Sequence, residues 1–236
     1  WMVRRQRQMC IRDSLYNFWK VLQSHGEELS DACIAIKKDH PDPITAKSLF
    51  NQAKDEIATA ESFRQAVLFW VLNKCSYSGL TENSAFSESA SNQNFSLRGA
   101  GNLRKYSPII KNWKITCEDY EDVMWNSIPQ AATYPFIFLD PPYKIKSYLY
   151  GTKADLHKNF DHQRFYDKCS FCSFRWMITY NVDDEIEKLY SNYNQKYFTL
   201  TYGMQHRANN KKQELLISNY DIQPQNPLEA HLYGRV

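Results

Sequence analysis

Residues 135–139, Pro-Phe-Ile-Phe-Leu, form a run without a single polar side chain. A continuous apolar run of this length is typical of a parallel strand that is buried on both faces. A second run, Trp-Met-Ile-Thr-Tyr over 176–180, follows a helical pattern over 163–174. Strands that alternate with helices favour an α/β sheet with right-handed crossovers. The remaining elements expected are a helix over 183–193 and two strands over 196–202 and 214–218, forming an antiparallel hairpin at one edge.

The N-terminal half of the chain shows helical periodicity instead. Apolar side chains recur at helical spacing over residues 14–36, and the proline-containing segment 39–43 then breaks the pattern. A second helix is expected over 45–60 and a third over 62–74. The third is apolar nearly all round, so we expect it to be buried.

Two further segments lie between these helices and the sheet. Residues 81–97 are rich in Ser and Asn, a composition typical of a mobile loop. Residues 114–117, Lys-Ile-Thr-Cys, are expected to form a short strand that ends at an acidic segment.

The formal net charge of +3 is concentrated in parts of the chain. Four arginines and one aspartate give residues 1–14 a net charge of +3 (4 − 1), so the remaining residues sum to zero. A uniformly basic protein that coats nucleic acid or a membrane is therefore not expected. Residues 98–114 hold five basic side chains and no acid, with Tyr106 and Trp113 interleaved. This stretch is either a solvated basic face or a nucleic-acid contact.

The sequence also argues against a membrane protein and a metalloprotein. Its longest strongly apolar run, residues 66–72, is much shorter than the roughly 20 residues that cross a bilayer. The basic start leads into polar residues, so no signal peptide is expected. The six cysteines are scattered, and Cys169 and Cys172 form a lone Cys-x-x-Cys without the other ligands of a zinc site. We expect a cytoplasmic protein with reduced thiols, no membrane span and no metal.

The segment Asp140-Pro141-Pro142-Tyr143 follows the apolar run 135–139 directly. In open α/β sheets, ligands bind at the carboxyl ends of the strands. The two prolines fix φ and remove two backbone donors, so the turn presents acceptors, namely the Asp140 carboxylate and backbone carbonyls. A group with two N–H donors, such as an exocyclic amine, matches this pattern, and Tyr143 offers a flat face for a base. The alternative is an ordinary turn with a solvent-facing aspartate.

The Asp-Pro-Pro-Tyr segment resembles the catalytic motif of adenine-N6 DNA methyltransferases that use S-adenosylmethionine. Three further segments are similar to the DNA adenine methylase family: the helix and turn over 62–80, the acidic segment 117–120 and the closing strand 211–219. The resemblance covers residues 14–220. It implies an α/β fold, a Rossmann-like methyltransferase sheet with a mostly helical DNA-recognition insertion.

The resemblance also implies a mechanism for this turn. Asp140 and the Pro141 carbonyl would accept the two hydrogens of the adenine amine, and Pro142 would keep the turn rigid. The nitrogen would then attack the sulfonium methyl group in line. Because the amine cannot be reached inside a duplex, the adenine would be flipped out and stacked on Tyr143.

Further site residues are carried over by the same resemblance. For the cofactor they are Asp119, Tyr120 and Asp140, although an acidic helix start explains Asp119 equally well. For DNA they are Asn73, Tyr77, Ser78, Gly79, Arg98, Arg104 and Lys105. Ser78 stands where the family has Asn, and Glu82 lies near the place of an Arg that is often found there. The recognised DNA sequence therefore does not carry over.

The resemblance assigns residues 15–40 and 112–220 to the catalytic core and 41–111 to target recognition, with a tail over 221–236. Residues 1–14 are either a non-native leader or a disordered basic arm. The glycine-rich cofactor motif of the family, Phe-x-Gly-x-Gly, has no counterpart, because Gly99-Ala100-Gly101 follows no apolar strand and fits a DNA-facing loop better. We therefore expect the first strand–helix unit to be missing and S-adenosylmethionine to be bound weakly or not at all.

The function expected is site-specific methylation of adenine N6 in double-stranded DNA by a monomer, in a phage or a restriction–modification system. Two alternatives stay open. One is an RNA methyltransferase with the same catalytic turn, and the other is an inactive fragment that binds DNA through residues 77–111.

Overall fold

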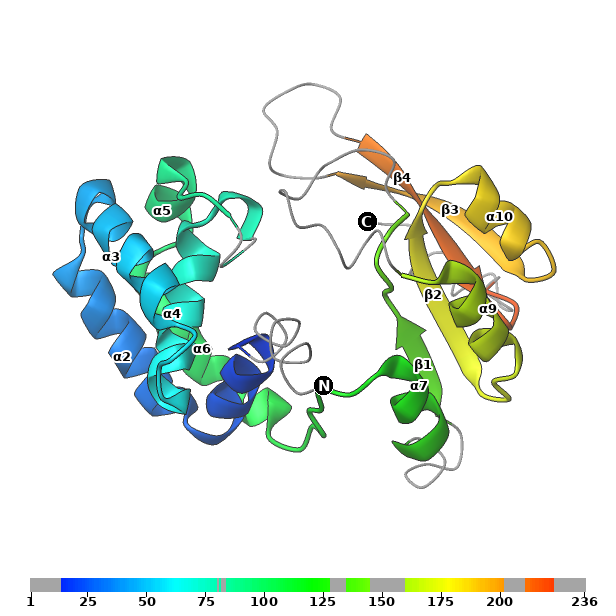
Figure 1. Cartoon of the computed structure of the whole chain (residues 1–236), viewed down its shortest axis with the longest axis horizontal. Coiled ribbons are helices and arrows are strands. Elements are labelled where there is room, and N and C mark those ends of the chain that lie inside the picture. The colour runs from blue at the N-terminus through cyan, green and yellow to red at the C-terminus, as the bar shows by residue number, and fades with distance from the viewer. Residues whose placement is uncertain are drawn as a thin grey trace, which may run out of the picture. The chain divides into compact units, whose positions relative to one another are not determined.

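The structure, a computed structural model, describes residues 14–79, 81, 84–127, 135–144, 160–201 and 211–222. The chain divides into two compact units, Trp1–Glu118 and Asp119–Val236, each with a hydrophobic core of its own (Figure 1). Within the described residues, no helix is long and apolar enough to cross a membrane.

The first unit is built from helices. A helix over residues 14–24 precedes α2 (Gly26–Asp39), α3 (Pro43–Glu56), α4 (Ser62–Cys75), the 3₁₀ turn η1 (Tyr77–Gly79), α5 (Glu88–Gln93) and α6 (Leu97–Ile110). Helix α3 begins after Asp42, whose side chain accepts hydrogen bonds from the backbone N–H groups of Ile44 and Thr45. Helices α3 and α4 confirm the two helices predicted over 45–60 and 62–74.

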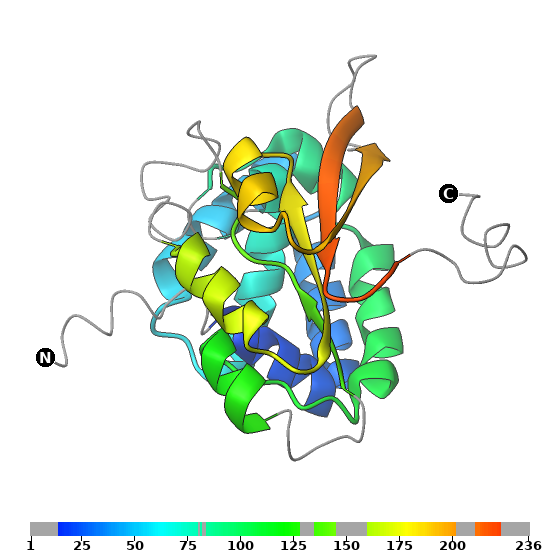
Figure 2. The same cartoon turned by 90° about the vertical axis from the view of Figure 1, so that its right-hand side faces the viewer.

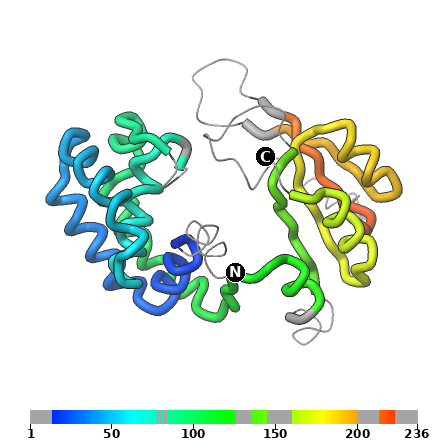
Figure 3. The backbone as a smooth tube through the Cα atoms, in the orientation of Figure 1, coloured from blue at the N-terminus to red at the C-terminus, as the bar shows by residue number. Residues whose placement is uncertain are grey.

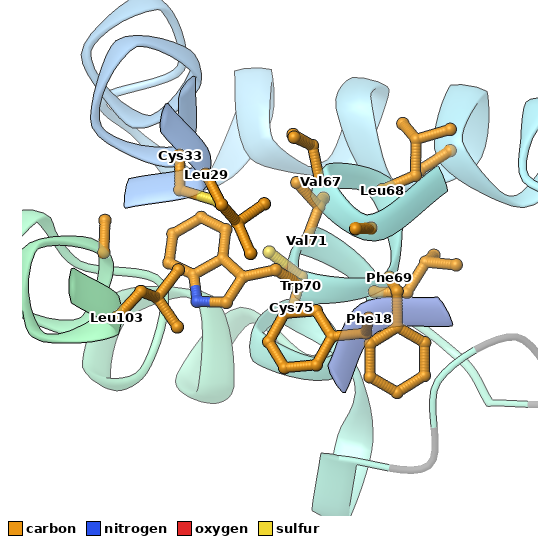
Figure 4. Close-up of a cluster of buried hydrophobic side chains, with 14 of the residues drawn as sticks. Phe18, Leu29, Cys33, Val67, Leu68, Phe69, Trp70, Val71, Cys75 and Leu103 are labelled. Atoms are coloured by element: carbon orange, nitrogen blue, oxygen red, sulfur yellow. The ribbon is translucent and has the colours of Figure 1, made fainter. Parts of the chain in front are cut away.

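Helix α4 forms the centre of this unit, as its apolar sequence predicts. Its residues Val67, Leu68, Trp70 and Val71 are buried, and Trp70 is only 1% exposed. Figure 4 shows these side chains packed with residues from the helix over 14–24, from α2 and from α6. Among the partners labelled there are Phe18, Leu29, Cys33 and Leu103. Residues 15–40, assigned from the sequence to the catalytic core, thus pack in the helical unit, while the division by function stays a prediction.

Three sequence expectations for this unit are wrong. Residues 81–97 are not simply a mobile loop, because they contain α5, and Phe95 is buried with its ring 5.1 Å from that of Trp70. A polar composition concealed both the serine cap of α5 at Ser87 and this aromatic anchor. Gly99, Ala100 and Gly101 lie inside α6 and therefore do not form a loop.

The short strand predicted over 114–117 is also absent. Residues 113–119 follow α6 without regular secondary structure (Figure 3). Instead of a strand, this segment supplies Asp119 as the cap of the next helix, with its side chain accepting from the backbone N–H of Glu121 at 3.0 Å.

The second unit is a mixed α/β structure with a four-stranded sheet in its described residues. Its elements are α7 (Tyr120–Asp122), η3 (Val123–Ser127), β1 (Phe136–Leu139), α9 (His162–Ser170), β2 (Arg175–Asn181), α10 (Asp184–Leu189), β3 (Asn194–Thr201) and β4 (Lys211–Ser218). The strand order is β1-β2-β4-β3, with β1 and β2 parallel and the other two pairs antiparallel. The predicted hairpin is confirmed, with β4 inside the sheet and β3 at its edge.

Helices α9 and α10 both cover one face of the sheet (Figure 2). Side chains that alternate along β2, Trp176, Ile178 and Tyr180, are buried against this layer. Strand β1 was expected to be buried on both faces, yet Phe136 and Phe138 are 54% and 58% exposed. The reason lies in this layering, since the helices described here cover only the other side of β1.

Candidate active site

The Asp-Pro-Pro-Tyr turn starts where β1 ends, at the carboxyl end of a parallel strand. Leu139 is paired with Ile178 of β2, so the next residue along each strand places Asp140 beside Thr179. The Thr179 hydroxyl Oγ1 donates a hydrogen bond of 2.9 Å to Asp140 Oδ1. Asp140 itself is exposed, whereas Pro141 is buried and anchors the turn. The carboxylate is thus held at one oxygen and accessible to a ligand.

Tyr143 is held by β4 at the other end of the turn. Its hydroxyl donates a hydrogen bond of 3.1 Å to Oε2 of Glu214, a residue that is only 4% exposed. Its ring lies 6.4 Å from the ring of Tyr180. Burial raises the pKa of Tyr143 well above its usual value, and the carboxylates of Glu214 and Asp140 raise it further. The hydroxyl is therefore a permanent donor, and its bond fixes the direction of the ring.

Asn181 and Lys144 complete the support of the turn. The side-chain amide of Asn181 on β2 donates to the backbone carbonyl of Lys144 at 3.0 Å. The Lys144 ammonium is paired with Glu185 of α10. Asn181 and Glu214 are partners in the β2–β4 register, so two neighbouring strands present polar side chains to the same turn.

Spacing rules alone do not identify these supporting residues, although the sequence contains a signal for them. Thr179 is the one polar residue in the apolar run 176–180, and Glu214 is the acidic residue that begins the apolar run of β4. Polar side chains inside strands that are otherwise apolar require partners. Here the partners lie in the turn that follows a different strand.

The residues expected to bind a cofactor lie at α7. Asp119 is exposed and caps the helix, which agrees with its alternative, structural interpretation. Tyr120 is half-buried, with its ring 5.1 Å from that of Phe165. Burial, followed by the charge of Glu121, raises the pKa of Tyr120 to about 12. Tyr120 and Tyr143 pack against the same buried cluster of the second unit.

Within the first unit, the residues expected to contact DNA at 73–79 form a turn that is held by hydrogen bonds. The amide Nδ2 of Asn73 donates to the carbonyl of Gly79 at 3.1 Å. Gly79 has φ of +70°, a conformation that favours glycine. Tyr77 is 61% exposed and is attached through its backbone N–H to the carbonyl of Ala85. Asn73 thus supports the turn while Tyr77 projects from it, and the side chain of Ser78 lies outside the described residues.

The three basic residues of α6 differ in their surroundings. Arg104 donates to Asp31 at 2.6 Å and to the Ser30 hydroxyl at 3.1 Å, and it pairs with Glu27 at 3.3 Å. Its charge is therefore used to join α6 to α2. Arg98 and Lys105 are exposed and seven residues apart, which places them on one side of the helix. These two are the cations of the predicted set that remain accessible.

Two comparisons with known proteins bear on this site. The family model of the D12 class N6 adenine-specific DNA methyltransferases matches residues 11–216. The Type II methyltransferase M.MjaIII of Methanocaldococcus jannaschii is 30% identical over 233 residues, which cover 89% of this chain and 78% of that protein.

Proposed function

The chain belongs to the D12 class of N6 adenine-specific DNA methyltransferases, and we propose that Asp140, Pro141, Pro142 and Tyr143 form its catalytic turn. Membership makes the chain an enzyme that methylates the N6 amine of adenine in DNA, with S-adenosylmethionine as the methyl donor. The similarity to a Type II methyltransferase fits a role in restriction and modification.

One observation carries the catalytic assignment. Thr179 occupies Oδ1 of Asp140, and in the described part of the chain the second oxygen, Oδ2, has no hydrogen-bond partner. The lone pair of an adenine amine is delocalised into the ring, so the nitrogen is a weak nucleophile. Oδ2 and the Pro141 carbonyl would accept its two hydrogens and favour a more tetrahedral nitrogen. The rate gain would come from positioning and electrostatics.

The same turn suits a cationic methyl donor. S-adenosylmethionine, when bound, supplies a methyl group on a positively charged sulfonium. Pro141 and Pro142 have no backbone N–H, so the turn offers only oxygen acceptors beside the Asp140 carboxylate. Asp140, Asp119 and Tyr120 are the residues that we propose to hold the donor. The N6 proton released by the transfer would pass to the Asp140 carboxylate or to water.

We further propose that the target adenine is flipped out of the duplex and stacks on Tyr143. The hydrogen bond to Glu214 supports this role, because it fixes the ring before a base arrives. In the first unit, the turn at Tyr77, Ser78 and Gly79 would approach the DNA, with Asn73 as its support. Arg98 and Lys105 would contact phosphates, and Arg104 would fix the helix that carries them.

The test is methyl transfer from radiolabelled S-adenosylmethionine to unmodified DNA, with identification of N6-methyladenine in the product. Asp140→Ala should abolish the transfer and leave thermal unfolding unchanged. Asp55→Ala, an exposed aspartate on α3, is the matched control and should keep full activity. Wild-type-like turnover by Asp140→Ala would rule out the catalytic role of Asp140. RNA in place of DNA tests the first alternative, and DNA binding without transfer by the wild-type chain would support the inactive fragment.

A further inference from the structure

We propose that Thr179 is a positioning residue for methyl transfer, whose hydroxyl fixes the Asp140 carboxylate and leaves Oδ2 available to the target amine. The proposal rests on the catalytic role of Asp140 and adds a residue outside the Asp-Pro-Pro-Tyr motif. It assigns a function to the single polar side chain in the apolar run of β2.

Strand β2 gives this hydroxyl a rigid base. β2 lies between β1 and β4, and Thr179 itself is paired with Leu216 of β4. Its neighbours Ile178 and Tyr180 are fully buried against the helical layer, so the Thr179 side chain lies on the opposite face. The side chain of a β-branched residue also has few rotamers. The donor is therefore fixed before any substrate binds.

Asp140 needs such a partner because its own surroundings leave it free to turn. It is exposed and lies just after the last residue of β1. The terminal torsion of an aspartate is broad, so an unattached carboxylate would rotate. The Thr179 hydroxyl has one hydrogen to donate, and at 2.9 Å that hydrogen goes to Oδ1. A displacement of about 1 Å in a reacting group can cost about a hundredfold in rate.

A purely structural role makes the opposite prediction for a pair of variants. If Thr179 serves the strand alone, Thr179→Val should be harmless, because valine keeps the shape and the β-branch. Thr179→Ser should then be the worse change, because it removes a methyl group and lowers β-propensity. If Thr179 positions Asp140, the ranking reverses, because serine keeps the hydroxyl and valine removes it.

The experiment measures kcat, KM for DNA and thermal unfolding for both variants of the full chain. We expect Thr179→Val to lower kcat about 10- to 100-fold with KM for DNA changed less than about threefold. Thr179→Ser should stay within about threefold of wild type. Thr199→Val on the exposed side of β3 is the matched control and should have no effect. Should the valine variant unfold, Thr179→Ala replaces it, assayed below its melting temperature.

Two results would overturn the proposal: wild-type kcat in Thr179→Val, or equal impairment in the serine and valine variants. Asp140→Ala assayed in parallel separates this failure from that of the proposed function. An inactive Asp140→Ala beside a fully active Thr179→Val removes only the positioning role. An active Asp140→Ala removes the catalytic assignment itself. In an Asp140→Asn background, the valine change should cost less than in wild type, because the two residues act as one unit.

Discussion

The hydroxyl of Tyr143 donates a hydrogen bond of 3.1 Å to the carboxylate of Glu214, which joins the Asp-Pro-Pro-Tyr turn to an interior strand of the sheet. The two residues are 71 positions apart in the chain. Because β4 lies directly beside β2, the strand order brings Glu214 within reach of the Tyr143 hydroxyl.

Tyr143→Phe should distinguish the contribution of the ring's fixed orientation from the contribution of its stacking on the base. The ring remains, so KM for DNA should change less than about threefold, while kcat falls about 10-fold because the ring is no longer fixed. Tyr143→Ala removes the stacking surface, a loss worth about 1–3 kcal/mol per base, so KM for DNA should rise as well. Steady-state kinetics on DNA distinguish the two variants.

Tyr197→Phe is the matched control for this experiment. Tyr197 donates to Glu187 at 2.9 Å on the surface of the same unit, so its loss removes an equivalent tyrosine–glutamate bond. We expect this control to keep wild-type kinetics. Identical kinetic losses in Tyr143→Phe and Tyr197→Phe would show that the bond to Glu214 acts through general stability alone.

The buried tyrosines predict how stability depends on pH. Burial raises the pKa of Tyr120 to about 12 and that of Tyr143 and Tyr180 further, whereas an unfolded tyrosine titrates at about pH 10. Below that pH both states keep the proton, so these residues contribute no pH dependence. Above it the unfolded chain releases protons that the folded chain retains, and the folded state loses stability. Urea unfolding at a series of alkaline pH values, followed by tyrosinate absorbance, should show the unfolding midpoint fall as tyrosinate forms on unfolding. A constant midpoint above about pH 10 would contradict this.

The sequence predicts those elements whose pattern is decided locally, and the site only in part. Helix α4 and strand β2 were found because apolar runs of their lengths have few other solutions. The sequence indicates Asp140 and Tyr143 as candidate site residues because two prolines after a strand end leave a rigid turn that presents oxygen acceptors. Thr179 lies 39 residues away from Asp140, and no spacing rule connects them before the sheet order is known. The strand at 114–117 failed for the complementary reason: a short β-like composition forms no strand without a neighbour to pair with.

Gly26 and Gly101 should respond in opposite ways to substitution by alanine. A Cβ at Gly26 would lie 2.3 Å from the Cβ of Ser107, where α2 and α6 pack closely. Gly26→Ala should therefore lower the free energy of unfolding by about 1–3 kcal/mol through overpacking. A Cβ at Gly101, inside α6, meets nothing within 4 Å, so Gly101→Ala should add about 0.5–1 kcal/mol. Denaturant melts of the two variants provide the measurement, and a destabilised Gly101→Ala would indicate that this position is not open as described.

Of the basic residues of α6, Arg98 and Lys105 should contact DNA, whereas Arg104 should serve the structure of the unit through its ion pairs. Arg98→Ala and Lys105→Ala should each weaken DNA binding and reduce the slope of log K against log salt by about 1, with little change in melting temperature. Arg104→Ala should instead lower stability by about 1 kcal/mol or less, because its partners Glu27 and Asp31 are themselves largely exposed.

Fluorescence anisotropy with labelled duplex DNA at several salt concentrations measures the first effect, and thermal melts measure the second. Lys47→Ala, an exposed cation on α3 of the same unit, is the control for the loss of one positive charge and should leave the salt slope unchanged. If Arg98→Ala and Lys105→Ala also leave the slope unchanged, the basic side of α6 is a solvated face, and the phosphate contacts of this enzyme lie elsewhere.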